Sequence, residues 1–353
     1  MSSPAERNPV FDLVKAAMML WVVWGHLGLY KIVAPETSVY MLNAKIGVNM
    51  PVFFVIGGYL AASTFKNADW CKLLSRSIHF LWPQLVMAVV YSIVMMPFGE
   101  KAFGWVLNAW FLHTYAIIYI MAAGVFRMAD TDGRRWCGFF ALYMAMIFWP
   151  SCIHLGWFGQ VTHMFPYFCF GLMCLGRSPL RIDWKIGCLC GAAYLAFVFL
   201  QGDSEVNGMN FWKVNVHWKT LFFDKMECAT FFARTTVGIT GSVFLLFLAK
   251  LAAEALPFVA RLSSLGTSSL GVYVVHEYPM YVLGRYLPDV PFPACSRWLV
   301  ALGVFIACHC LVCLLKRCRI TRLVFFGDEA SLTSLLRRVS SHAKQHDAMN
   351  GHR

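Results

Sequence analysis

The sequence predicts an all-α integral membrane protein with about ten transmembrane helices and both termini in the cytoplasm. Of its 353 residues, 59% are hydrophobic and only 14% are charged, against about 45–50% and about 25% in soluble domains. A soluble protein of this composition would expose too much apolar surface, and disordered, collagen-like and coiled-coil chains are excluded as well. We attribute the formal charge of +12 to cytoplasmic loops that face membrane lipids, and we expect no nucleic-acid partner.

Apolar runs of about 20 residues, the length that crosses about 30 Å of hydrocarbon, recur along the chain. The connections are short except 202–225, so we expect one transmembrane domain, 10–315, between a cytoplasmic segment, 1–9, and a basic cytoplasmic tail, 316–353. The first run carries charges and lacks a clear cleavage site, which indicates a retained helix. The predicted spans are 10–30, 44–65, 78–97, 103–126, 136–154, 163–176, 185–201, 226–249, 264–286 and 297–315.

The distribution of basic residues sets the orientation of these spans. With the N-terminus inside, 20 of the 30 lysines and arginines fall on the cytoplasmic side and eight on the other, while Lys15 and Arg234 lie within spans. Every cytoplasmic connection is then basic, as the positive-inside rule requires. Four of these residues lie at the start of the tail, and we expect them to meet anionic lipid headgroups: Lys316, Arg317, Arg319 and Arg322.

The first span contains three ionisable residues, Asp12, Lys15 and His26, and such side chains inside a membrane usually face a cavity or a partner. Lys15 and His26 are eleven residues apart, which places them on one helix face about 16 Å apart along the axis. Asp12 lies one turn from Lys15 and can pair with it. The alternative is a lysine that reaches the headgroups and a histidine bonded to a neighbouring helix.

The ninth span contains a second unusual pair, His276 followed at once by Glu277. Adjacent helical residues diverge by about 100°, so at least one of the two side chains should line a cavity. A structural hydrogen bond between helices is the alternative.

The connection after the second span carries Lys66, Lys72 and Arg76. Such a cluster suits an anionic, phosphate-bearing ligand, although an ordinary cytoplasmic loop would look the same. A metal site is not expected. Cys308, Cys310 and Cys313 accompany His309, but on a continuous helix these side chains do not converge as four ligands must.

Together these segments resemble the acyltransferase 3 family of integral-membrane O-acyltransferases. The first span, FDLVKAAMMLWVVWGHLGLY, is similar to the family's opening signature through Lys15 and His26, and the second, NMPVFFVIGGYLAAS, through its aromatic pair and Gly58. Gly57 stands where the family usually has serine. SRSIHFLWP resembles the next landmark, with Arg76 in place and His79 instead of a second arginine, and AWFLHTY, MFPYFCFGLMCLG and SLGVYVVHEYP resemble the later ones.

The resemblance implies a stand-alone enzyme of the bacterial inner membrane with no permanently bound cofactor. Acetyl-coenzyme A would be the acyl donor, with its phosphates near Lys66, Lys72 and Arg76, and the acceptor would be a hydroxyl of a cell-surface glycan or lipid-linked sugar. We expect His26 to act as general base or to carry the acyl group transiently.

The other polar residues have expected supporting roles. Lys15, paired with Asp12, would hold the donor or fix the local field, and His276 or Glu277 would orient the acceptor. The rival hypothesis is a proton-coupled transporter in which Asp12, Lys15, His26 and His276 form the pathway. That hypothesis predicts a hydropathy repeat between halves, which the sequence does not show.

Overall fold

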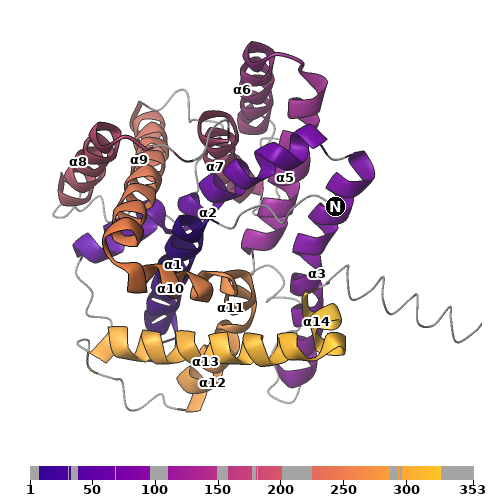
Figure 1. Cartoon of the computed structure of the whole chain (residues 1–353), viewed down its shortest axis with the longest axis vertical. Coiled ribbons are helices and arrows are strands. Elements are labelled where there is room, and N and C mark those ends of the chain that lie inside the picture. Colours follow the sequence, from indigo (N-terminus) through magenta and orange to yellow (C-terminus); the bar gives the residue numbers. More distant parts are fainter. Residues whose placement is uncertain are drawn as a thin grey trace, which may run out of the picture.

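The protein is described by a computed structural model that covers residues 8–30, 32, 39–67, 69–95, 110–148, 158–176, 180, 182–200, 225–286, 293 and 296–326. Most of the predicted segment 1–9, residues 202–224 of the long connection 202–225, and the tail beyond 326 lie outside these residues. Within them the fold is all-helical and contains no strand. The helical class expected from composition is therefore confirmed (Figure 1).

The helices follow the order of the predicted spans. They are α1 (Pro9–Leu29), α2 (Val39–Asn67), α3 (Trp70–Met95), α5 (Trp110–Met128), α6 (Asp132–Phe148), α7 (Phe158–Phe170) with the π-helical turn η3 (Gly171–Leu175), α8 (Trp184–Leu200), α9 (Lys225–Ala255), α10 (Pro257–Gly266), α11 (Ser269–Val275), α12 (Glu277–Tyr286), α13 (Arg297–Arg317) and α14 (Arg319–Phe326).

Six helices in the described part of the chain are long and apolar enough to cross a membrane, and they lie in α1, α2, α3, α5, α9 and α13. The shorter helices α6 and α8 have 17 residues each. The count of ten spans and the cytoplasmic placement of both termini therefore stay predictions. What the helices establish is a multi-pass membrane protein.

Helix α1 lies inside the bundle and contacts α2, α9, α10 and α13 (Figure 1). Its start is specified locally: the Asn8 side chain accepts a hydrogen bond from the Val10 N–H, and Pro9 fits the first helical position. Val23 and Leu27 are fully buried. A helix that is buried and apolar on most sides can hold its few polar residues only against partners, which makes those partners informative.

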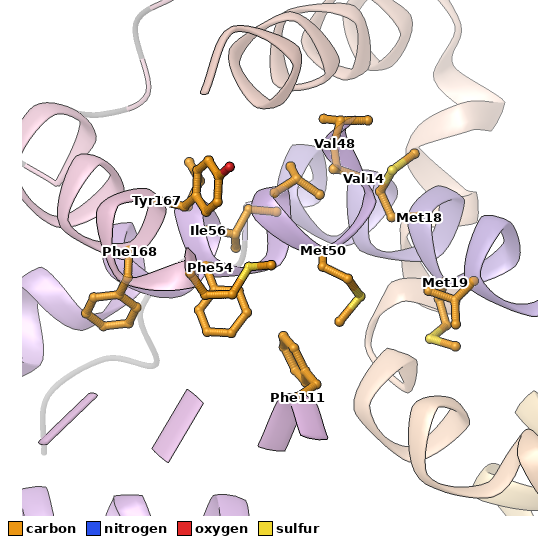
Figure 2. Packing of buried hydrophobic residues seen from close by; sticks show 14 of the residues in the cluster. Val14, Met18, Met19, Val48, Met50, Phe54, Ile56, Phe111, Tyr167 and Phe168 are labelled. Carbon is orange, nitrogen blue, oxygen red and sulfur yellow. The ribbon is translucent and has the colours of Figure 1, made fainter. Parts of the chain in front are cut away.

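Helix α2 approaches α7 and the η3 turn closely because glycine lies on both sides of the crossing. A Cβ on Gly58 would overlap the Phe168 carbonyl oxygen, and a Cβ on Gly171 would overlap the Val55 carbonyl oxygen. Around this crossing, Phe54 of α2 and Phe168 of α7 are fully buried (Figure 2). The glycines thus fix the position of α2, which carries one wall of the site described below.

The predicted ninth span, 264–286, is not one continuous helix, and this corrects the sequence-based expectation. It is broken at 267–268 and again at His276, giving α10, α11 and α12. At the first break the hydroxyls of Thr267 and Ser268 donate to the carbonyls of Ser264 and Leu265, which caps the end of α10. At the second break, Pro279 in the first turn of α12 has no N–H to continue the helix.

Candidate active site

The break between α11 and α12 frees the backbone carbonyl of Tyr273, which the His276 side chain uses. Nδ1 of His276 lies 2.7 Å from the Tyr273 carbonyl oxygen and 3.2 Å from that of Val272. In a continuous helix the Tyr273 carbonyl would accept the N–H of residue 277. The helix break therefore provides the acceptor that orients this fully buried imidazole.

The other ring nitrogen of His276 meets the first helix. Its Nε2 lies 3.0 Å from Nδ1 of His26, and the two ring planes are 24° apart with centroids separated by 4.9 Å. A carbonyl only accepts, so Nδ1 of neutral His276 carries the proton and its Nε2 is the acceptor. His26 then donates from Nδ1, which leaves the lone pair on its own Nε2. The hydrogen-bond partners thus select the tautomer of His26 in which Nε2 is the base.

Glu277 completes this cluster. Its Oε1 lies 3.8 Å from Nδ1 of His26, and its side chain is 12% exposed. Its carboxylate also hydrogen-bonds the Tyr30 hydroxyl at the end of α1. A carboxylate at this distance stabilises the positive charge that His26 gains when it takes a proton.

The donor atoms of His26, His276 and Glu277 all lie within 4.8 Å of one another, a separation that a metal ion also accepts. We interpret their proximity as a hydrogen-bonded relay, because the two imidazoles are already at hydrogen-bond distance. The cysteines of α13 do not join them. His309 instead lies 2.6 Å from the Ser268 hydroxyl and 3.5 Å from Cys313 Sγ.

Asp12 and Lys15 form the ion pair that their spacing predicts, with Nζ 2.5 Å from Oδ1. The carboxylate is almost buried, at 6% exposure, whereas the Lys15 side chain is 23% exposed. The backbone of Asp12 packs directly on Gly266 at the end of α10. The pair therefore holds a charged side chain at the junction of α1 and α10.

A cavity of about 210 Å³ opens beside Lys15. Its walls come from α1, α2, α3, α5 and the α10–α11 break, and most are apolar. Met50 and Leu60 mark its extent along α2, a distance of about 15 Å at 1.5 Å per residue. Figure 2 shows Met50 and Phe54 of α2 pointing towards Phe111 of α5, which lies on the cavity wall. The cavity is thus a narrow slot beside the first helix.

Of the basic residues at the α2–α3 corner, Arg76 has neighbours that lie one helical turn from the slot. Lys66, Lys72 and Arg76 are all exposed. Arg76 donates to the Thr64 hydroxyl over 2.5 Å and lies close enough to the Tyr119 hydroxyl to act on it electrostatically. Each of these three residues lies one helical turn from a residue that lines the cavity. Thr64 follows Leu60 in α2, Arg76 precedes Phe80 in α3, and Tyr119 follows Tyr115 in α5. A ligand that fills the slot can therefore place a charged end group at Arg76.

The opposite end of the slot approaches the histidines. Tyr273 lines the cavity, and its ring centroid is 5.7 Å from that of His276. Tyr273 thus relates the two predicted groups of polar residues. It lines the same cavity as Lys15, which pairs with Asp12, and its ring lies near that of His276. Sequence reasoning gave Tyr273 no role, although it stands three residues before His276. Sequence reasoning also did not identify Phe111 and Tyr115 as cavity-lining residues, because apolar residues that line a cavity have the same sequence pattern as residues of the core.

Comparisons with known proteins show which proteins this chain resembles. The model of the acyltransferase domain family matches residues 8–317. The Nodulation protein NolL of Sinorhizobium fredii (strain NBRC 101917 / NGR234) is 22% identical over 226 residues, an alignment that covers 52% of this chain and 57% of the relative. The chain thus spans little more than half the length of that relative. No solved structure gives a significant match.

Proposed function

The chain belongs to the acyltransferase domain family, whose model it matches over 8–317, and on that premise we propose that it is a membrane O-acyltransferase that transfers an acetyl group from acetyl-coenzyme A to a sugar hydroxyl. The observation that carries the proposal is the His26–His276 pair at 3.0 Å, which leaves Nε2 of His26 as a base. A hydroxyl needs such a base because it is a weak nucleophile until its proton is removed.

The donor is proposed to enter from the α2–α3 corner. Its phosphates would lie near Arg76, Lys72 and Lys66, and its uncharged arm would fill the slot along α2 past Lys15. The slot is apolar apart from a few groups, which suits a long chain with few charges. Asp12 fixes the position of the Lys15 ammonium, so that this cation meets the donor in one orientation.

The reaction is proposed to take place at His26. Nε2 takes the proton of the acceptor hydroxyl as its oxygen attacks the thioester carbon, and the coenzyme A thiolate leaves. His26 is then positively charged, and Glu277 at 3.8 Å stabilises that charge. His276 keeps the imidazole in the reactive tautomer, the role that the third member of a hydrolase triad has towards its histidine.

The acceptor is proposed to be a glycan or lipid-linked sugar at the bacterial inner membrane. The His26 side chain is 22% exposed, so a hydroxyl can approach it. A lipid-linked acceptor would reach this depth from the bilayer.

The test is transfer of radiolabelled acetyl from acetyl-coenzyme A to a membrane glycan fraction by the purified protein in detergent. His26→Ala should abolish transfer while acetyl-coenzyme A still raises the thermal midpoint, since the donor site is intact. His113→Ala is the matched control, because His113 pairs with Gln84 and does not line the slot. Acetyl transfer that persists in His26→Ala would show that His26 is not the general base. A wild-type protein that is folded but binds no donor at millimolar concentration would favour the transporter hypothesis.

A further inference from the structure

Two imidazoles and one carboxylate converge where α1 meets the break between α11 and α12. They belong to His26, His276 and Glu277, and one donor atom from each lies within 4.8 Å of the others. Two histidines and one glutamate form a ligand set that Zn²⁺ uses in sites that keep a fourth position open. His276 is fully buried, whereas the His26 side chain is 22% exposed. The set therefore has a closed side and a side that an ion can reach.

We propose that these three side chains bind a divalent transition-metal ion, Zn²⁺ in the first instance, and that the bound ion inhibits acyl transfer. The hydrogen-bonded relay described above is then the active, metal-free form. The binding half of the inference stands without the proposed function. The inhibition half rests on it, because it takes Nε2 of His26 to be the base.

The distances in the cluster are close to those that a tetrahedral ion needs. Ligand bonds of about 2.0–2.2 Å in a tetrahedron separate the ligand atoms by about 3.4 Å. Nδ1 of His26 lies 3.0 Å from Nε2 of His276 and 3.8 Å from Oε1 of Glu277, so each distance is within about 0.4 Å of that value. The whole set spans no more than 4.8 Å, and rotation of the glutamate side chain closes the remaining difference.

His276 already has the tautomer that a metal ligand requires. Its Nδ1 lies 2.7 Å from the Tyr273 carbonyl oxygen, which keeps the proton on Nδ1 and the lone pair on Nε2. A metal-ligating histidine almost always donates its other ring N–H in this way, and a ligating carboxylate is held by a partner of its own. The Tyr30 hydroxyl lies against the Glu277 carboxylate. The helix break thus supplies supporting contacts as well as ligands.

A metal ion on Nδ1 of His26 blocks the base without touching Nε2. Neutral imidazole carries one proton, so ligation breaks the Nδ1–H bond, that proton passes to water, and Nε2 takes a proton from water. The charge of the ring is unchanged, but Nε2 now donates and cannot accept the proton of an acceptor hydroxyl. Among the described residues that line the donor slot, none of the three ligands appears, so acetyl-coenzyme A should still bind.

The first experiment titrates the purified protein with Zn²⁺ in a calorimeter, without a polyhistidine tag, donor or acceptor. We expect a site that Mg²⁺ does not occupy, since imidazole ligands suit Zn²⁺ and not Mg²⁺. His276→Gln and Glu277→Gln should each weaken this site by more than about 100-fold, beyond the cost of about 10–100-fold for losing a residue that only supports a ligand. Glu277→Gln keeps the side-chain shape and so keeps the test valid if His276→Gln does not fold.

His309→Ala is the matched control. His309 lies on α13 beside the Ser268 hydroxyl and the Cys313 thiol, a second place where a histidine and a thiol could recruit Zn²⁺. This variant should keep the wild-type affinity. Affinity that is lost in His309→Ala, or that is equal in wild type and Glu277→Gln, would overturn the metal site.

The second experiment measures acetyl transfer against Zn²⁺ concentration. We expect kcat to fall while the KM for acetyl-coenzyme A stays constant, with half-inhibition at the concentration that half-fills the calorimetric site, and activity should return when a chelator removes the ion. Zn²⁺ that fills the cluster and leaves transfer unchanged would overturn the inhibition. Zn²⁺ binding at the cluster of a folded wild-type protein that binds no acetyl-coenzyme A would overturn the proposed function and leave the metal site in place.

Discussion

The crossing of α2 with α7 and η3 gives a sharp test of how the slot is held in position. Gly58 of α2 meets the backbone of α7 and η3, so that a Cβ there would lie 2.8 Å from the Leu172 nitrogen and would overlap the Phe168 carbonyl oxygen. Ordinary contact begins at 3.4 Å, so relief of the Leu172 contact alone requires a movement of about 0.6 Å, and the deeper overlap with the Phe168 carbonyl oxygen requires a larger one. The obstacle is backbone on both sides, which no rotamer change can relieve.

We expect Gly58→Ala to lower the free energy of unfolding. The overpacking term is about 3 kcal/mol, the upper end of its range, and the higher helix propensity of alanine offsets about 1 kcal/mol of it. Gly124 of α5 is the matched control, since a Cβ there meets nothing within 4 Å. Gly124→Ala should therefore gain the helix-propensity term alone, about 1 kcal/mol. With about 2 °C per kcal/mol for a large domain, the thermal midpoints of the two variants should differ by about 6 °C.

The assay is thermal unfolding in detergent followed by tryptophan fluorescence, with the same scan rate for each variant because membrane proteins often unfold irreversibly. Acetyl-coenzyme A binding is measured in parallel. Gly58 adjoins the slot-lining residue Gly57, so the shifted α2 should also weaken donor binding. Equal midpoints for Gly58→Ala and Gly124→Ala would refute the argument that the crossing is held by backbone contact.

Three further changes act on the site itself. His276→Asn should lower acyl transfer about 10²–10⁴-fold, the range for a misoriented base, and leave acetyl-coenzyme A affinity unchanged; full activity would show that His276 does not set the tautomer of His26. Gly57→Ala should weaken acetyl-coenzyme A binding about tenfold, because its Cβ would displace the Tyr115 ring that lines the slot, and a calorimetric titration checks this. Arg76→Ala should weaken coenzyme A binding about tenfold at low salt, as loss of a charged hydrogen bond does, and the salt dependence of binding should flatten; identical salt curves for variant and wild type would place the phosphates elsewhere.

Much of the protein could be predicted from local sequence properties. The membrane class follows from composition, and the helices follow from runs of apolar residues, since a backbone in hydrocarbon must satisfy its own hydrogen bonds. The pairing of Asp12 with Lys15 follows from a spacing of one helical turn within α1. Each of these depends on residues that are near one another in the chain.

Only the tertiary structure decided how the site is assembled. His26 and His276 are 250 residues apart in the chain and meet at 3.0 Å, and no periodicity links two helices so distant. The break at His276 was also hidden, because the run 264–286 is apolar enough to look like one span, and only its contacts show that the imidazole takes the carbonyl of Tyr273. The sequence determined which residues were too polar to face lipid. The packing of α1 against α11 and α12 determined which of those residues touch. The reason is that side-chain contact between helices depends on how the helices cross and not on residue order.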